Sequence, residues 1–335
     1  MHKKIDLKIN EYSSDLSSII VKTSLVFNIK NQAKNRKKLI VNLGLVNNIR
    51  RVNKFHEQVN SLLVDSGIYI SCGETLEERR NRVWEKAPFG FKNFVRIIDF
   101  IYKRVIPKVP IFKNIYFMLT RGNNRVISST EMLGRLISCG FKIVETFEEN
   151  NIFYIISKKT SVPEYNMKAS YGLFCRFRRL GYEKQPFFIY KIRTMHPYSE
   201  YLQKDFFKIE NLNKDGDKIK NDFRLTSWGK LLRKYWIDEL PQLWNLIKGD
   251  LAIVGVRALS KDKFKLYSKE LQDLRTQFKP GILPPYYADL PSNFKELQDS
   301  EKKYLQAKST NSVQTDIKYF FKIIFNIIFK NARSS

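Results

Sequence analysis

The sequence is poor in the residues that build metal centres and disulfide frameworks. Its 335 residues include three cysteines and three histidines. The cysteines, Cys72, Cys139 and Cys175, are widely spaced and have no histidine cluster near them. A structural zinc site and a disulfide framework are therefore not expected, and the composition favours a reducing compartment.

Long apolar segments are also lacking. The chain contains no window of about 18 uninterrupted apolar residues, which is the length that crosses a bilayer. The N-terminal run MHKKIDLKINEYSSDLSSII has no apolar core followed by a small-residue cleavage site, and it therefore predicts no signal peptide. Any contact with a membrane is expected at its surface.

Acidic residues are outnumbered throughout the chain. There are 33 Asp and Glu against 60 Lys and Arg, which gives a formal charge of +27. Such an excess favours an anionic partner: nucleic acid, an anionic membrane surface or a phosphorylated substrate. Because no helix-turn-helix, zinc-finger or RNA-recognition signature occurs, nucleic acid is not an expected partner. With 43% hydrophobic residues, the chain is expected to pack into one large or two modest domains.

We divide the chain into a basic N-terminal segment, residues 1–37, and two domains, 38–160 and 161–335. In the first domain the runs LIVNLGLV and GIYISCG predict two strands. The helix between them is marked by apolar residues at helical spacing, Val52, Phe55, Val59, Leu62 and Leu63. A second α/β unit follows, with a helix from about Glu131, a stop at Gly140 and two strands.

Two segments are amphipathic and basic. Residues 91–119 are rich in aromatic residues and are broken by Pro107 and Pro110. They predict either an inserted helix that covers a sheet or a surface that meets lipid headgroups. Near the C-terminus, an otherwise apolar helix has a polar residue at every fourth position, Lys318, Lys322, Asn326 and Lys330. This helix either packs on the core of its domain or docks into a membrane interface.

The second domain contains two adjacent carboxylates, Asp238 and Glu239, inside a basic stretch. A purely structural interpretation is that Asp238 caps a helix, that Glu239 favours the positive end of the helix dipole and that Pro241 occupies the first turn. The cations nearby favour a functional interpretation instead. Lys191 and Arg193 alternate on the predicted strand YKIRTM, so both would point to one face.

Three arginines complete this set of cations, Arg224 and Arg233 before the acidic pair and Arg257 after it. Arginine gives the bidentate hydrogen bonds that a diphosphate requires. Carboxylates placed among such cations would hold Mg²⁺, which prefers oxygen ligands and substrate phosphates, or would attack phosphorus.

These residues resemble a known family, the bacterial sugar transferases, which are monotopic polyprenyl-phosphate phosphoglycosyl transferases. The resemblance covers about residues 171–330 and rests on motifs in the family's order, YKIRTM, DFRLTSWGKLLRKYWIDELPQLWNLIKGDLAIVGVRAL and KPG. It implies transfer of a sugar phosphate from a UDP-sugar to a polyprenyl (undecaprenyl) phosphate with Mg²⁺, at the cytoplasmic face of the bacterial inner membrane. The product would start exopolysaccharide, capsule, O-antigen or glycoconjugate synthesis. Whether the chain associates with copies of itself or with other glycan-assembly enzymes stays open.

The resemblance also implies a role for each site residue. Asp238 would be the covalent nucleophile that takes the phosphosugar and passes it to the polyprenyl phosphate. Glu239, together with Asp238, would hold Mg²⁺. Arg257 and the other four cations would stabilise charge on the phosphate oxygens.

Three features depart from the family pattern. Family members begin with a long apolar re-entrant helix, whereas NMKASYGLFC is too short for one, so the two amphipathic segments are the expected membrane contacts. The family's Gly-Pro-Arg-Pro run is Gly255-Val256-Arg257-Ala258 here, which predicts a less rigid loop. The run ILPPYYADLP is also unusual, and its aromatic residues could contact the lipid acceptor or the sugar. These departures support a second hypothesis, a catalytically degenerate membrane-associated scaffold of a glycan-assembly complex.

The first domain is similar to the C-terminal part of a Rossmann-like methyltransferase domain. The glycine-rich turn that would hold S-adenosylmethionine is missing, because LGLVNN has the wrong glycine spacing. We therefore expect a degenerate, non-catalytic domain that supports or recruits the transferase domain. The expected fold class is α/β, with an α+β second half that carries amphipathic membrane-surface helices.

Overall fold

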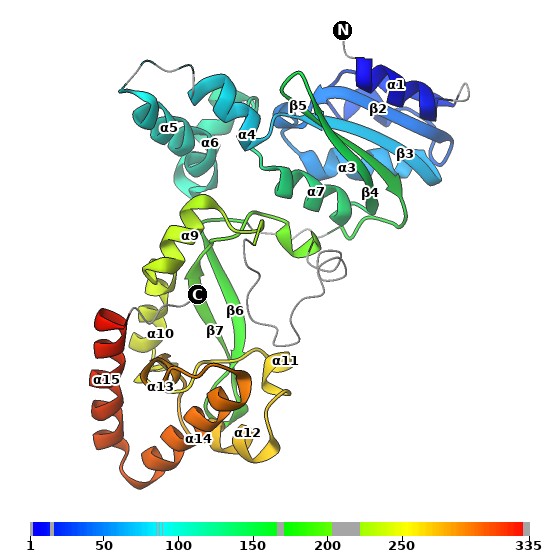
Figure 1. Cartoon of the computed structure of the whole chain (residues 1–335). Coiled ribbons are helices and arrows are strands. Elements are labelled where there is room, and N and C mark those ends of the chain that lie inside the picture. Colours follow the sequence, from blue (N-terminus) through cyan, green and yellow to red (C-terminus); the bar gives the residue numbers. More distant parts are fainter. Residues whose placement is uncertain are drawn as a thin grey trace. The chain divides into compact units, whose positions relative to one another are not determined.

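The computed structural model describes residues 3–13, 17–84, 86, 88, 90–165, 171–202 and 222–330. It is mixed α/β, as predicted, and its contacts divide the chain into two units (Figure 1). Unit 1 comprises Met1–Leu173 and Met195–Asn211, and unit 2 comprises Phe174–Thr194 and Leu212–Ser335.

Unit 1 is built on a five-stranded sheet. Its strands, in spatial order, are β1 (Ser18–Val21), β2 (Lys37–Leu45), β3 (Leu63–Gly73), β5 (Ile152–Lys159) and β4 (Phe141–Glu149). The first three are parallel to one another, whereas β5 is antiparallel to both of its neighbours. Because a parallel pair needs a crossover connection, α3 (Val52–Leu62) lies between β2 and β3 in the chain.

Side chains that alternate along the strands cover both faces of this sheet. Ile40 and Ile155 pack with α3 and α7 (Ser129–Ser138), whereas Leu39 and Val41 pack with Ile5 of α1 (Lys3–Tyr12) on the opposite face (Figure 1). The carboxylate of Glu149 on β4 accepts hydrogen bonds from the backbone N–H groups of Lys4 (2.9 Å) and Ile5 (3.1 Å). These contacts satisfy two donors of the first turn of α1.

The predicted elements of the first domain are present, with shifted ends. Leu63, which the sequence placed on the helix, is the first residue of β3, and the cap of α7 is Ser128, whose hydroxyl accepts from the Glu131 N–H. The sequence also set residues 1–37 apart as a basic segment. In the structure Ser18–Val21 pairs with β2 and α1 covers the sheet, because the apolar residues of this segment supply an edge strand and a helix face.

The remaining elements of unit 1 are short. They are α2 (Phe27–Lys30), η1 (Val46–Asn48), α4 (Leu76–Arg79), η2 (Arg80–Trp84), α5 (Lys92–Phe100), η3 (Ile101–Val105), η4 (Ile106–Lys108) and α6 (Pro110–Thr120). As predicted, the prolines interrupt the 91–119 segment, since Pro107 lies in η4 and Pro110 begins α6. The prediction that this segment covers a sheet is wrong, because most apolar side chains of α5 and α6 are exposed.

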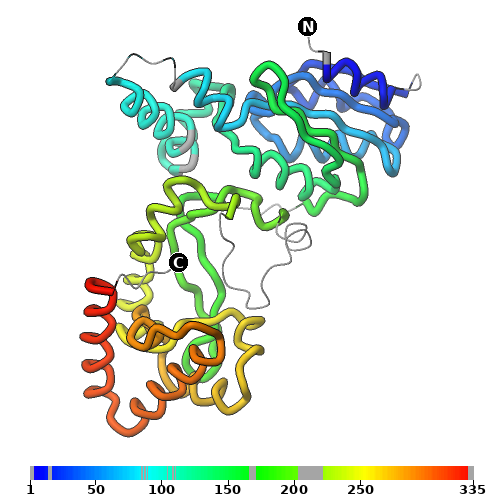
Figure 2. Tube along the Cα trace, viewed as in Figure 1, coloured from blue at the N-terminus to red at the C-terminus, as the bar shows by residue number. Residues whose placement is uncertain are grey.

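Unit 2 joins two small sheets to a set of helices. Strands β6 (Phe174–Leu180) and β7 (Pro186–Ile192) form an antiparallel ribbon (Figure 2), and β8 (Ala252–Val254) pairs in parallel with β9 (Gly281–Leu283). The helices are η5 (Tyr182–Lys184), α9 (Ser227–Lys234), η6 (Ile237–Gln242), α10 (Leu243–Ile247), α11 (Lys261–Phe264), α12 (Lys269–Thr276), α13 (Tyr286–Asp289), α14 (Phe294–Thr310) and α15 (Ser312–Phe329).

The last helix, α15, packs on the core of its domain, which is one of the two expectations for it; docking into a membrane interface stays a prediction. One face buries Tyr319 and Ile323 in the core of unit 2, and another exposes Phe321 and Phe325. The four-residue polar stripe is not wholly on the surface. The amide of Asn326 is buried and donates to the backbone carbonyls of two residues of α13, Tyr287 (3.0 Å) and Ala288 (2.8 Å).

Candidate active site

Three of the predicted site residues form one ion cluster in unit 2. The ammonium of Lys191, on β7, donates to Glu239 Oε1, and Arg257 Nη2 donates to the same oxygen at 3.2 Å. Glu239 lies in η6, and Arg257 lies just beyond β8. Burial alone would raise the pKa of Glu239, but the charges of Arg257 and Lys191 outweigh it and hold the pKa below its ordinary value. Glu239 is therefore fixed in its ionised form.

The neighbouring carboxylate, Asp238, has a different environment. Its side chain is buried, and among the described residues it accepts no hydrogen bond from another side chain. Burial raises the pKa of Asp238 above its ordinary value; Lys191 and Arg233 oppose this rise, and the charge of Glu239 adds to it. Two adjacent carboxylates thus have opposite pKa shifts, which is the pattern expected when one carboxylate positions and the other reacts.

Of the other three predicted cations, Arg233 lies near this pair, where its charge acts on Asp238, whereas the described interactions of Arg224 and Arg193 are with other residues. Arg233, on α9, donates from Nε to the Thr194 hydroxyl at 3.0 Å, and burial lowers its pKa while the charge of Asp238 opposes the shift. Arg224 is buried in a paired contact with Asp222, with Nη2 to Oδ2 at 2.7 Å, and both charges act on Arg233. Arg193 follows the end of β7, and its charge, like that of Lys191, acts on the Cys175 thiol across the ribbon.

The local backbone explains how the acidic pair reaches these cations. Trp236 has a left-handed conformation (φ 55°) between α9 and η6, so the chain turns sharply there. The predicted capping role of Asp238 is wrong, because Trp236 occupies the cap position and Asp238 is the second residue of η6. The charges of Lys191 and Arg233 act on its carboxylate, which also accepts a hydrogen bond from its own backbone N–H.

A buried amide that the sequence reasoning missed fixes η6 and α10 to the ribbon. Asn245 is fully buried, and its Nδ2 donates to the Phe188 carbonyl at 2.7 Å and to Asp250 Oδ2 at 3.0 Å. Its Oδ1 accepts from the Tyr190 N–H at 3.3 Å. These bonds place the acidic pair beside Lys191, one residue farther along β7. An Asn seven residues after the acidic Asp238 gave no distinctive signal in the sequence.

The loop of residues 255–258, which we call the arginine loop, lacks the family's prolines, but other contacts hold its backbone. Val256 is buried in the core of unit 2, and its carbonyl accepts from the Gly281 N–H at 3.0 Å. Arg275 donates to the Arg257 carbonyl at 2.6 Å. A Cβ added at Gly281 would meet the Gly255 nitrogen at 2.1 Å, so the close approach of these two backbones requires glycine.

Two further residues at the site were not among the predicted ones. Tyr286, in the unusual run ILPPYYADLP, accepts a hydrogen bond from Arg257 Nη1 at 2.7 Å and so holds the guanidinium from the side opposite Glu239. Burial lowers the pKa of Arg179, on β6, and the charge of Arg257 adds to this shift. The side chain of Arg257 nevertheless stays 40% exposed, which leaves it able to meet a substrate phosphate.

Asp238 and Glu239 are too few ligands to form a magnesium site from protein groups alone. The described residues contain no cluster of three or more His, Cys, Asp or Glu side chains suited to a metal. Mg²⁺, however, is commonly held by one or two carboxylates together with substrate phosphates and water. Asp238 and Glu239 supply that number of carboxylates beside Lys191 and Arg257, so the donor set fits Mg²⁺ bound together with a diphosphate.

Comparison with known proteins identifies a family and several relatives. The family model described as bacterial sugar transferase matches residues 162–330. The galactosyl transferase CpsE of Streptococcus agalactiae is 32% identical over 47% of this chain and 34% of its own length. The uncharacterized sugar transferase EpsL of Bacillus subtilis is 39% identical over 36% of this chain and 54% of its own length.

A third relative carries a more specific name. The undecaprenyl-phosphate galactose phosphotransferase of Salmonella typhimurium is 36% identical over 31% of this chain and 23% of its own length. The chain therefore spans between about a quarter and about half of the length of these three relatives.

Proposed function

The chain belongs to the bacterial sugar transferase family, and we propose that it transfers a sugar phosphate from a UDP-sugar to a polyprenyl phosphate of the undecaprenyl type. The observation that carries this proposal is the pair of carboxylates in one cation cluster. Asp238 is buried with a raised pKa, while Glu239 is locked between Lys191 and Arg257. The name of the Salmonella relative, an undecaprenyl-phosphate galactose phosphotransferase, supports the choice of acceptor.

In the proposed first step, a carboxylate oxygen of Asp238 attacks the phosphorus that carries the sugar. A bond forms between this oxygen and phosphorus, and the bond from phosphorus to the bridging oxygen breaks, so that UMP leaves with the bridging oxygen. Burial favours this step, because a carboxylate that is poorly stabilised as an anion gains more from reaction with an electrophile. The product is an aspartyl phosphosugar.

In the second step, a phosphate oxygen of the polyprenyl phosphate attacks the same phosphorus and releases the Asp238 carboxylate. Arg257, Lys191 and Arg233 stabilise the negative charge on the phosphate oxygens in both steps. Glu239 keeps Lys191 and Arg257 in place through its shared oxygen. Asp238 and Glu239 would hold Mg²⁺ together with the diphosphate, and the ion would supply further charge neutralisation.

An exposed apolar face beside the site supports a lipid acceptor. Directly after the acidic pair, Leu240, Leu243, Trp244 and Ile247 are all at least half exposed, at a spacing that places them on one side of η6 and α10. In the described part of the chain, no helix combines the length and apolar character needed to cross a bilayer. From this exposed apolar face and the charge of +27 we propose contact with an anionic membrane surface, at the cytoplasmic face of the bacterial inner membrane, where the product would start polysaccharide or glycoconjugate synthesis.

The test is the release of UMP from a panel of UDP-sugars by the full chain with undecaprenyl phosphate in liposomes and Mg²⁺. We expect release with at least one donor, and Asp238→Asn should lower it by at least about a thousandfold. The matched control is Asp262→Asn, because Asp262 is exposed on α11 and should leave activity unchanged. Folded protein that releases no UMP from any donor would favour the scaffold hypothesis instead.

A further inference from the structure

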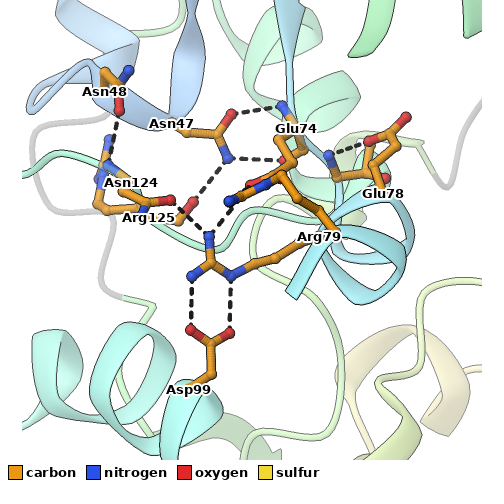
Figure 3. A network of polar contacts seen from close by, with 10 residues as sticks. Asn47, Asn48, Glu74, Glu78, Arg79, Asp99, Asn124 and Arg125 are labelled. Carbon is orange, nitrogen blue, oxygen red and sulfur yellow. Dashed lines mark hydrogen bonds and ion pairs between the residues drawn. The ribbon is translucent and has the colours of Figure 1, made fainter. Parts of the chain in front are cut away.

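The α5 helix is attached to the rest of unit 1 through one polar side. Arg79, on α4, forms a two-bond contact with Asp99 on α5, with Nε to Oδ2 at 2.8 Å and Nη2 to Oδ1 at 2.7 Å (Figure 3). Arg79 is almost fully buried and also donates to Asn124 Oδ1 at 2.7 Å and to Glu74 Oε2 at 3.3 Å. A paired guanidinium contact fixes orientation as well as distance.

The same network reaches the strand ends of the sheet. Asn47, after β2, donates from Nδ2 to the backbone carbonyls of Glu74 and Arg125, both at 2.8 Å (Figure 3). Its Oδ1 accepts from the Glu74 N–H at 2.7 Å. Glu74 is held directly after β3 by Asn47, and it in turn binds Arg79. The side of α5 that carries Asp99 therefore faces the sheet-bearing part of unit 1.

The α6 helix is attached by a different kind of contact, which also uses one side. Tyr116 is buried, with its ring centroid 5.6 Å from that of Tyr102. The guanidinium of Arg50 lies over the Phe117 ring at 5.6 Å. Gly122, just after the helix, has a positive φ of 82°, and a Cβ added there would lie 3.2 Å from the Cβ of Arg50. The side of α6 with Tyr116 and Phe117 therefore faces unit 1.

The opposite sides of both helices are apolar and exposed. These side chains have exposed fractions between 46% and 78%, and they are Phe94, Ile97, Ile98 and Ile101 on and after α5, and Ile111, Phe112, Ile115, Met118 and Leu119 on α6. At 100° per residue, each set covers one continuous arc of its helix. We name these residues the α5–α6 apolar face. An exposed apolar surface of this kind marks a binding surface on a soluble body.

Charge indicates what covers this face. On α5 the exposed Lys92 and Arg96 are four residues apart on the polar side, and Lys103 follows in η3. The whole chain carries a charge of +27. A short helix with aromatic and aliphatic residues on one side and basic residues on the other is suited to the interface of an anionic bilayer, where the apolar side enters the headgroup region.

We propose that the α5–α6 apolar face docks unit 1 onto an anionic lipid bilayer, with both helices lying in the interface plane. The inference goes beyond the proposed transferase function, because unit 1 holds none of the proposed catalytic residues. Arg79 and Arg50 hold the two helices by their inner sides, so that their apolar sides face away from unit 1. Two helices attached to one body would bind together, which a single short amphipathic helix achieves only weakly.

The test is flotation of the full chain with vesicles of phosphatidylcholine that contain 30% phosphatidylglycerol, about the anionic content that attracts basic segments. The vesicles contain neither a UDP-sugar nor polyprenyl phosphate, so the outcome does not depend on the transferase activity. We expect the wild type to float, and the variant Ile97→Gln/Ile98→Gln/Ile111→Gln/Ile115→Gln to partition at least about tenfold less. Replacing Lys92 and Arg96 by Gln should weaken flotation on these vesicles but not on pure phosphatidylcholine.

The matched control is Val144→Gln/Val162→Gln, which changes two exposed apolar residues of unit 1 outside the face and should leave flotation unchanged. Circular dichroism must show that each variant is folded. The proposal is overturned if the wild type does not float or if the quadruple variant floats as well as the wild type. It is also overturned if light scattering shows that the face instead joins two copies of the chain, so that the variant loses a dimer and keeps its flotation.

Discussion

At the scale of single residues, the site depends on a division of labour between two neighbouring carboxylates. Glu239 receives two cationic donors on one oxygen, whereas Asp238 is buried among cations without a direct hydrogen bond from any described side chain. The opposite pKa shifts follow from this difference, because hydrogen bonds favour the charged form and burial disfavours it.

The anchoring of Arg257 can be tested at Tyr286. Tyr286→Phe removes the hydroxyl that accepts from Nη1, so the guanidinium loses one of the two hydrogen-bond acceptors, Tyr286 and Glu239, that the described residues give it. We expect kcat/KM for the UDP-sugar to fall by about tenfold to about a hundredfold, since a hydrogen bond to a charged group contributes about 1.5–3 kcal/mol. The control is Tyr182→Phe in η5, an exposed tyrosine that does not contact Arg257. Equal kcat/KM values for wild type and Tyr286→Phe would show that Tyr286 does not position Arg257.

A second residue-scale prediction concerns stability and pH in unit 1. His56 is fully buried between the rings of Phe55 and Tyr69, its Nδ1 has no partner among the described residues, and burial lowers its pKa to about 3. Its ordinary pKa is 6.5. Below that pH the unfolded chain binds one proton more than the folded chain, so stability is full above pH 6.5 and decreases as the pH falls toward 3.

We therefore expect His56→Leu to flatten the pH dependence of unfolding. The free energy of unfolding of the wild type, relative to the variant, should decrease by up to about 1.4 kcal/mol per pH unit between pH 6 and pH 4. Urea denaturation across this range measures the difference. Phe55→Leu, which changes the same contact without a titrating group, should shift stability by a constant amount. A constant difference for His56→Leu as well would contradict the assignment.

The sequence predicted the charged residues of the site better than the neutral ones. Lys191, Arg233, Asp238, Glu239 and Arg257 could be found because charges that recur near an acidic pair have a direct chemical meaning. Asn245 and Tyr286 could not be found in that way, because a neutral polar side chain acquires its role only from the backbone and side chains that folding brings to it.

At the scale of elements, the arginine loop is held by a buried ion pair between two helices. Arg275 on α12 pairs with Glu301 on α14, and both side chains are almost fully buried. Arg275 also donates to the Arg257 carbonyl, and so connects the helix pair to the loop. Contacts from distant elements therefore hold a loop that lacks the family's prolines, and its lower rigidity stays a prediction.

Removing one or both partners of this pair should have different effects. Arg275→Met leaves the Glu301 carboxylate buried without its cation, and we expect a loss of about 3–5 kcal/mol in the free energy of unfolding. The double variant Arg275→Met/Glu301→Leu should recover most of this loss. UMP release should stay reduced in both variants, because both lack the bond to the Arg257 carbonyl. If the two variants were equally unstable, the burial cost of an unpaired Glu301 would not be the cause.

Most elements could be predicted from periodicity, but their partners could not. The strand and helix patterns of residues 39–73 located β2, α3 and β3, because apolar spacing is a local property. The four-residue strand β1 was missed, since so short a run inside a polar segment has no clear period. The prolines located the breaks of the α5–α6 segment in the sequence. Whether other residues cover its apolar side could not be predicted, because that depends on how the rest of unit 1 folds.

At the scale of the whole molecule, the chain carries a formal net charge of +27. Exposed apolar side chains are present on α5 and α6 in unit 1 and on α10 and α15 in unit 2. An anionic surface attracts each unit through its charge, and apolar contact then adds to the binding.

This combination predicts a salt-dependent but incomplete release from membranes. Raising the ionic strength from about 0.1 M to about 1 M shortens the screening length from about 10 Å to about 3 Å. We expect partition of the full chain onto vesicles with 30% phosphatidylglycerol, the composition used above, to fall about tenfold or more, while partition onto neutral vesicles stays constant. Binding to anionic vesicles that does not respond to salt would show that charge has no part in the association.

The central claim is that Asp238 carries the phosphosugar, and the mass of the intact protein tests it most directly. The chain is incubated with a UDP-sugar that supports turnover, but without polyprenyl phosphate. We predict that each chain gains the mass of one sugar phosphate and that one UMP is released for each sugar phosphate gained. Peptide mapping should place this gain on Asp238, and Asp238→Asn should show neither adduct nor UMP. UMP release without an adduct, or an adduct that persists in Asp238→Asn, would contradict the account.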